Sequence, residues 1–211
     1  MKNSRWRLRA ACIFAIFFYY ASSAASDSVT IRVHFLHGSK PKRQFRHEED
    51  RWFGGVLGGH AGIEYEPNRI LNFQPRSRFH VYAHPRLINS KFSIHDTLSF
   101  YEILGGRYDS VKKTVVSLRI SARQKQRLDS VAGAYQQRCP YDYAFFGMRC
   151  GAAAYDVLAG SGVVYQYSFR KTWRKIFYPR KLRRRLENYA SQKGFLIRRE
   201  KGSNRRIWEA D

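Results

Sequence analysis

Cys150 combines the features that a nucleophilic thiol needs. It follows an aromatic loop, 141–149, and it begins an alanine-rich segment, 151–159, that is typical of a helix. A thiol at a helix N-terminus meets the positive end of the backbone dipole, which stabilises the thiolate, the reactive form. We therefore predict that Cys150 is a nucleophile at the start of a helix.

A thiol nucleophile also needs a base and a group that orients the base. His60 lies in a glycine-rich run at the head of a predicted strand, 60–65, and the segment 70–73 is predicted to return beside it. In that hairpin Asn72 would lie nearly opposite His60, where Cβ atoms are about 4.5–5.5 Å apart. These residues predict a Cys-His-Asn site. Glu64, on the same strand face as His60, is the alternative orienting group.

Acyl chemistry further requires donors for the negative charge that develops on the carbonyl oxygen. The backbone N–H of Cys150 is the natural donor. Tyr141 and Tyr143, just upstream, are candidates for a phenolic donor or for contact with the substrate. Packing in the core is the alternative interpretation of both tyrosines.

A disulfide is the main alternative to a catalytic Cys150. Beyond the first 25 residues the sequence contains only Cys139 and Cys150, and the loop between them is long enough to close a bridge. Oxidising compartments favour such bridges. A Cys139–Cys150 disulfide would make the protein a non-catalytic envelope-binding module, and the sequence leaves both interpretations open.

Residues 1–25 have the pattern of a secretory signal peptide. Basic residues precede an apolar run, 10–20, and small residues suited to cleavage follow at 21–26. We therefore predict export to the periplasm or cell envelope. An uncleaved membrane anchor is the alternative, although a span needs about 20 apolar residues. The remaining chain, 26–211, fits one domain.

The chain is strongly basic, with a formal net charge of +23. Such an excess favours polyanions, including anionic lipid headgroups and acidic cell-wall polymers, and the predicted export disfavours nucleic acid as a partner. The charge is concentrated in a C-terminal extension, about 165–211. Within it Arg183, Arg184 and Arg185, on a predicted helix over 179–192, are expected to form an anion-binding surface.

The sequence gives no reason to expect a cofactor or a metal. It has no C-x-x-C pair, phosphate-binding loop or dinucleotide fingerprint. The pairs His34–His37 and His80–His84 have spacings compatible with metal ligands, but neither has a third ligand nearby in the sequence.

The expected fold class is α+β, a small antiparallel sheet packed against helices. Period-two alternation and branched residues predict strands, whereas capping residues and apolar stripes predict helices. The expected strands are 28–36, 60–65, 70–73, 79–82 and 114–120, with edge strands at 195–197 and 207–208. The expected helices are 96–104, 122–137, 150–159 and 179–192.

This order of a histidine strand, an asparagine strand, a helix and a cysteine helix resembles the circularly permuted, papain-like branch of the NlpC-type superfamily. That branch includes the lecithin:retinol acyltransferase-like proteins, and the similarity is greatest to secreted bacterial members. The matching segments are 59–72 and 143–158. The resemblance implies a permuted papain-like fold with His60 as base, Cys150 as nucleophile and Asn72 as third polar group.

Two departures from that pattern limit what the resemblance implies. The acyltransferase members tend to have histidine at the third position, where this chain has Asn72. Polar and aromatic residues usually follow their cysteine, whereas Gly151 and three alanines follow here. The sequence therefore favours a secreted cysteine hydrolase or acyltransferase that acts on an amide or ester bond, in a cell-wall peptide or a lipid, without singling out lipid acyl transfer.

Overall fold

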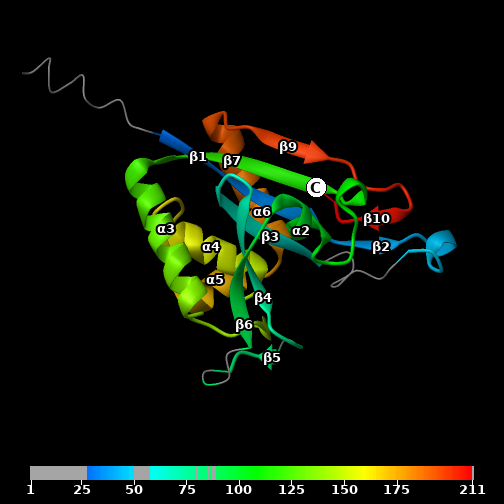
Figure 1. Cartoon of the computed structure of the whole chain (residues 1–211), viewed down its shortest axis with the longest axis horizontal. Coiled ribbons are helices and arrows are strands. Elements are labelled where there is room, and N and C mark those ends of the chain that lie inside the picture. Colours follow the sequence, from blue (N-terminus) through cyan, green and yellow to red (C-terminus); the bar gives the residue numbers. More distant parts are fainter. Residues whose placement is uncertain (1–27, 50–57, 79, 85, 87–88, 211) are drawn as a thin grey trace, which may run out of the picture.

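The chain has a mixed α+β fold built around one antiparallel sheet (Figure 1). The structure, a computed structural model, describes residues 28–49, 58–78, 80–84, 86 and 89–210. The predicted α+β class is confirmed. The predicted signal peptide, 1–25, lies outside the described residues. Within the described part of the chain, no helix is long and apolar enough to cross a membrane.

The central sheet has six strands, and every neighbouring pair in it is antiparallel. In order across the sheet they are β6 (Ser90–His95), β4 (Arg69–Pro75), β3 (Gly59–Glu66), β1 (Ser28–His37), β7 (Lys113–Ser121) and β9 (Ile197–Glu200). Strand β6 was not predicted, and it extends the sheet beyond the predicted hairpin of β3 and β4.

The β3–β4 hairpin fixes the relation between the predicted base and its predicted partner. Gly62, not His60, lies directly opposite Asn72. His60 is two residues from Gly62, and side chains alternate between the faces of a strand. His60 and Asn72 therefore share one face of the sheet as diagonal neighbours, and the predicted pairing is offset by two residues.

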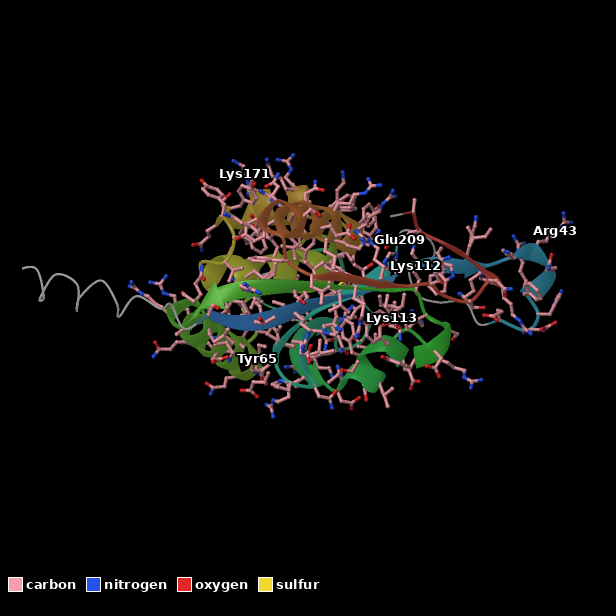
Figure 2. The ribbon with its side chains drawn as sticks, turned by 90° about the horizontal axis from the view of Figure 1, so that it is seen from above. Arg43, Tyr65, Lys112, Lys113, Lys171 and Glu209 are labelled. Atoms are coloured by element: carbon pink, nitrogen blue, oxygen red, sulfur yellow. The ribbon has the colours of Figure 1, made fainter. Side chains whose placement is uncertain are left out.

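Helices cover both faces of the sheet. They are α2 (Thr97–Glu102), α3 (Ala122–Gln137), α4 (Cys150–Gly160), α5 (Phe169–Lys175) and α6 (Pro179–Lys193). Figure 2 shows α4, α5 and α6 on one side of the sheet and α2 on the other. Helix α4 packs on β3 and β4, which brings its first residue to the end of the hairpin.

The predicted helix boundaries follow from local capping chemistry. Asp96 caps α2 by accepting from the Ser99 backbone N–H, and Ser121 forms a capping box with Gln124 at the start of α3. Pro179 occupies the first turn of α6, whose C-cap is Gly194. Helix α5 was not predicted.

Helix α4 lies close to its neighbours because its first turns have small side chains. Ala152 and Ala153 are buried in the main core cluster between the sheet and the helices. A Cβ at Gly151 would be 2.9 Å from the Cα of Pro179, too close for any other residue without a shift of α6. Gly151 and the alanines after it, which depart from the acyltransferase pattern, are therefore explained by the close packing of α4 against α6 and the core.

Two short sheets and two 3₁₀ turns complete the described elements. Strand β2 (Ser39–Pro41) pairs with β10 (Arg206–Trp208), and β5 (His80–Tyr82) pairs in parallel with β8 (Ala144–Phe146). The turns are η1 (Arg43–Phe45) and η3 (Tyr108–Ser110). The region predicted as a basic extension is part of the domain, because Leu182, Leu186 and Ala190 of α6 are buried in its core.

Candidate active site

Cys150 and His60 meet where α4 begins and β3 starts. The Cys150 side chain is buried, 3% exposed, and the His60 imidazole forms a hydrogen bond with its thiol. The neighbouring Gly59 has a φ of 86°, and a Cβ there would be 2.4 Å from the carbonyl oxygen of Leu36. Glycine is therefore required next to His60 so that β3 can approach β1 at this point.

Asn72 holds the other side of the His60 ring. His60 Nε2 lies 3.0 Å from Asn72 Oδ1. The amide nitrogen of Asn72 donates to the carbonyl oxygen of Ser93 at 3.1 Å, which fixes which end of the amide faces His60. Nε2 of His60 therefore carries the donated proton, and Nδ1 is left for the thiol.

The electrostatics of the site favour an ion pair of thiolate and imidazolium. Burial alone would raise the pKa of the Cys150 thiol, but the charge and hydrogen bond of His60, helped by Arg149 and Tyr143, lower it below its ordinary value. Burial would lower the pKa of His60, but the charge of Cys150 and the hydrogen bonds to Cys150 and Asn72 raise it. Both shifts favour the charged, reactive form of the pair.

Tyr143 lies beside the thiol, whereas Tyr141 does not contact it. Burial, followed by the charge of Cys150, raises the pKa of the Tyr143 phenol well above 10, and the hydroxyl forms hydrogen bonds with the thiol and the backbone N–H of Cys150. Tyr141 instead packs in the core against Phe73 and Tyr135, next to Asp156. The prediction of Tyr141 as a donor is therefore corrected, because its ring faces Tyr135 and Asp156 and not Cys150.

Glu64 serves another part of the sheet. Its carboxylate accepts from Arg32 at 3.1 Å and from the Asn68 backbone N–H at 2.9 Å, and it lies 2.9 Å from His34 Nε2. The His34 hydrogen bond is the main cause that lowers the pKa of Glu64 to about 2. The alternative of Glu64 as orienting group is therefore corrected, because neighbours on β1 and in the hairpin turn hold its oxygens.

His95 and Gln74 were missed by the sequence analysis. His95 Nδ1 accepts from the Asn72 amide nitrogen at 2.8 Å, and Gln74 Nε2 donates to Asn72 Oδ1. Burial and the charge of His60 lower the pKa of His95, which favours its neutral, accepting form. The alternation of Phe92 and Ile94 with polar neighbours in 90–95 is the signal that would have placed His95 on a strand.

A cleft of about 610 Å³ reaches the site from outside. The wall of the cleft is largely apolar, and it includes His60 and Tyr143, the two residues that contact the Cys150 thiol. The lining residues are Gly59, His60, Gln74, Pro75, Ser77, Arg78, Ile103, Leu104 and Tyr143. A ligand in this cleft would therefore contact His60 and Tyr143 directly.

The arrangement is that of a thiol with a base, an orienting amide and a nearby donor. The chain matches no protein-family model, no curated protein and no solved structure. In the part of the chain that the structure describes, no group of three or more His, Cys, Asp or Glu side chains is placed to hold a metal ion.

Cys139 and Cys150 are free thiols, so the alternative of a Cys139–Cys150 disulfide is corrected. Cys139 lies just beyond α3, where its Sγ is 3.2 Å from Ser90 Oγ and 3.3 Å from the carbonyl oxygen of Tyr141. Cys150 is instead engaged with His60 at the start of α4. The separate partners explain why the two thiols do not form a bridge.

The predicted anion-binding surface loses one of its three residues. Arg184 and Arg185 are exposed, but Arg183 is buried, 1% exposed, on the same face of α6 as Leu186. Its guanidinium donates to Glu209 Oε1 at 2.5 Å and to the carbonyl oxygen of Ala210 at 2.9 Å. The placement of Arg183 is corrected because the helical period brings it to the core face, where a buried carboxylate pairs with it.

Asp142 connects the aromatic loop to the segment 80–89. Its buried carboxylate lies 2.6 Å from His80 Nδ1 and accepts the backbone N–H of Asn89 at 2.8 Å and of His84 at 3.0 Å. The backbone N–H of His80 also donates to the carbonyl oxygen of Tyr143. Asp142 therefore fixes the segment that carries Tyr143 into the site.

We expect the Asp142→Asn variant to lower the free energy of unfolding by about 1–3 kcal/mol, because a buried amide at this position cannot accept from all three donors. Burial would raise the pKa of Asp142, but His80 and the two backbone donors lower it. The stabilisation is therefore complete above the ordinary carboxyl pKa of about 3.9 and is lost as the pH falls through the lowered value.

Urea unfolding at neutral and at acid pH measures this effect. Asp129→Asn is the matched control, because Asp129 forms only a partly exposed pair with Lys125 on α3 and should change stability by less than about 1 kcal/mol. Equal effects of the two substitutions, or an Asp142→Asn effect that persists unchanged at acid pH, would contradict the role of the Asp142 carboxylate.

Proposed function

We propose that this chain is a secreted cysteine hydrolase or acyltransferase that acts on an amide or ester bond in a cell-wall peptide or a lipid. The observation that carries the proposal is the buried Cys150 thiol, whose pKa is lowered by its pairing with His60, next to a cleft that opens on the same histidine. Asn72 supports it by holding the ring of His60 at 3.0 Å. Structural thiols lack such a charged partner.

In the first half of the proposed reaction, the Cys150 thiolate attacks the carbonyl carbon of a substrate bound in the cleft. The oxygen of that carbonyl becomes negative and receives hydrogen bonds from the Cys150 backbone N–H and the Tyr143 hydroxyl, which lie together beside Sγ. The His60 imidazolium gives its proton to the leaving amine or alcohol. The C–N or C–O bond breaks, and a thioester on Cys150 remains.

In the second half, neutral His60 takes a proton from water or from another acceptor, whose oxygen or nitrogen attacks the thioester carbonyl. The C–S bond breaks, the acyl group leaves with the acceptor, and the thiolate and imidazolium are restored. Asn72 keeps the imidazole in one orientation through both steps by accepting from Nε2. Whether water or a second substrate enters decides between hydrolysis and transfer.

The proposal includes a permuted papain-like fold and an exported protein. The order of β3 with His60, β4 with Asn72 and α4 with Cys150 supports the permuted fold, and the sequence pattern of residues 1–25 supports export. The exposed Arg184 and Arg185 support an anionic surface as a further partner. Nucleic acid is not proposed as a partner.

A thiol-directed acyl probe tests the proposed nucleophile. We expect the probe to label the protein covalently and to lose that labelling in Cys150→Ser, because a serine hydroxyl at this position is not ionised by His60. Cys139→Ser is the control and should keep full labelling, since Cys139 lies away from His60. Labelling that persists in Cys150→Ser would contradict the proposal.

A further inference from the structure

The small β5–β8 sheet presents an exposed apolar edge. Val81, Tyr82 and Phe146 are 58%, 72% and 43% exposed. Tyr82 lies in register with Phe146, and their rings stack with centroids 5.3 Å apart. Tyr82 and Phe146 therefore form a small stacked aromatic patch that faces solvent. Val81 is a further exposed apolar side chain on the opposite face of the same strand edge. Exposed apolar groups of this kind often mark binding surfaces.

This edge is joined to the candidate active site on both sides. Arg78, two residues before β5, lines the cleft, and the backbone N–H of His80 in β5 donates to the carbonyl oxygen of Tyr143. Phe146 of β8 lies four residues before Cys150 in the sequence. A partner that holds this edge would therefore lie at the mouth of the cleft.

The charge around the edge is positive. The sequence contains no Asp or Glu between Glu66 and Asp96. Arg78 and Arg86, which precede and follow β5, are exposed. The nearest carboxylate in the loop before β8, that of Asp142, is buried and paired with His80. Among the described residues, the edge therefore combines apolar side chains with exposed arginines for which no ion pair with a carboxylate is found.

We propose that Arg78, Val81, Tyr82 and Phe146, here called the docking edge, bind the surface of an anionic phospholipid bilayer. The apolar side chains would enter the headgroup region, where Tyr and Phe rings are well accommodated, and the arginine would pair with lipid phosphate. A stable protein interface needs about 800 Å² on each partner, whereas a bilayer surface is held by a few apolar side chains together with cations.

This inference rests on the anionic surface of the proposed function and deepens it by assigning a bilayer to the docking edge, whose binding does not require Cys150. It also defines where the proposed reaction would take place. Since Arg78 belongs both to the cleft wall and to the docking edge, the cleft would open toward the bilayer. Substrates embedded in the membrane, or attached to its surface, would then reach His60 without leaving the membrane.

Vesicle flotation tests the docking edge. The full chain is mixed with vesicles of equimolar phosphatidylglycerol and phosphatidylcholine, and with vesicles of phosphatidylcholine alone. We expect binding to the anionic vesicles that weakens about tenfold or more in Tyr82→Ser/Phe146→Ser, because two inserted rings are lost. We also expect it to weaken in Arg78→Glu and at about 1 M salt, where the Debye length is about 3 Å.

Tyr165→Ser is the matched control for the aromatic substitutions. Tyr165 has the same exposed fraction as Tyr82, 72%, but it lies between α4 and α5. Its removal should leave binding unchanged. If Tyr165→Ser or an Arg184→Glu/Arg185→Glu variant lost binding while Tyr82→Ser/Phe146→Ser kept it, the bilayer would contact α5 and α6, and the proposal would be overturned.

Two further outcomes would also overturn the proposal. The first is equal binding to both kinds of vesicle, which would show that anionic lipid does not contribute to binding. The second is no binding of the unsubstituted chain at low salt, which would leave a protein or a cell-wall polymer as the partner of the edge. Labelling of Cys150 by the soluble acyl probe should be unchanged in Tyr82→Ser/Phe146→Ser, so failure of the docking edge is distinguishable from failure of the proposed reaction.

Discussion

Cys150 will react with iodoacetamide at pH values well below the ordinary thiol pKa of about 8.5, and its reaction rate will show the titration of an activated thiol. The expected shift is downward because His60, Arg149 and Tyr143 together lower the pKa of Cys150 by more than burial raises it. At a pH of about 6.5 an ordinary thiol is about one per cent ionised, whereas a larger fraction of Cys150 should be thiolate because its pKa is lowered.

Mass spectrometry without reductant locates the alkylated cysteine and gives a rate for each thiol across the pH range. Cys139 is the internal control, because it lies beside Ser90 and the carbonyl oxygen of Tyr141 with no cation among these contacts. Because Cys150 is buried, the pH dependence of the rate, and not its absolute value, reports ionisation. The ultraviolet absorbance of the thiolate in a Cys139→Ser background measures the same titration independently of access.

His60→Gln should reverse the shift. Without the imidazolium, burial dominates, and the pKa of Cys150 should rise by about one unit or more, which is about tenfold less thiolate at a fixed pH below the pKa. His34→Gln is the matched control, because His34 is also buried on the sheet but pairs with Glu64 and Tyr101. An unchanged Cys150 titration in His60→Gln would show that the pKa of the thiol does not depend on His60. A Cys150 titration centred near pH 8.5 in the unsubstituted chain would remove the basis of the proposed reaction.

The site was predictable to the extent that its signals are local or periodic. A cysteine at the start of an alanine-rich helix is visible in the sequence, and the alternation along β3 and β4 places His60 and Asn72 on one face even though their pairing is offset by two residues. An offset of one residue would have turned Asn72 to the opposite face. The prediction therefore depended on the register between β3 and β4, which periodicity alone does not determine.

Other parts of the site depend on contacts between distant segments. His95 contacts Asn72 because β6 pairs with β4. The length of the connection between these two strands does not predict that they pair. Tyr141 and Tyr143 are two residues apart in one aromatic loop, so their sequence context is almost the same. Both rings pack against Phe73. They differ in their other neighbours, because Tyr141 faces Tyr135 and Asp156 whereas Tyr143 faces Cys150.

The helices show the same division between local and distant causes. The start of α3 is determined by a capping box of adjacent residues, and the ends of α6 by Pro179 and Gly194, so these boundaries were predictable. The burial of Arg183 was not, because its carboxylate partner Glu209 lies beyond β9 and β10 in the sequence. The spacing of Arg183 from Leu186 and Ala190 places it on the apolar face of α6. Burial of a cation there was nevertheless not predicted, because the carboxylate that pairs with it is distant in the sequence.

Arg183→Met should be strongly destabilising, by about 3–5 kcal/mol in the free energy of unfolding, because it leaves the Glu209 carboxylate buried without its cation. The Arg183 and Glu209 side chains are each about 1% exposed, and the guanidinium also donates to His37 and to the carbonyl oxygen of Ala210. The substitution therefore removes the contacts that hold the C-terminal residues against α6 and β1.

Arg184→Met provides a closely matched control, with the same chemical change one residue along the same helix. Arg184 is exposed, so its loss should change stability by no more than about 0.5 kcal/mol. Urea unfolding of the two variants measures the difference. Arg183→Met/Glu209→Gln should recover part of the lost stability, because removing both charges leaves no unpaired ion in the core. Equal stabilities of Arg183→Met and Arg184→Met would mean that Arg183 belongs to the basic surface. A double variant no more stable than Arg183→Met would show that the packing of the arginine side chain, and not its pairing with Glu209, stabilises the C-terminal segment.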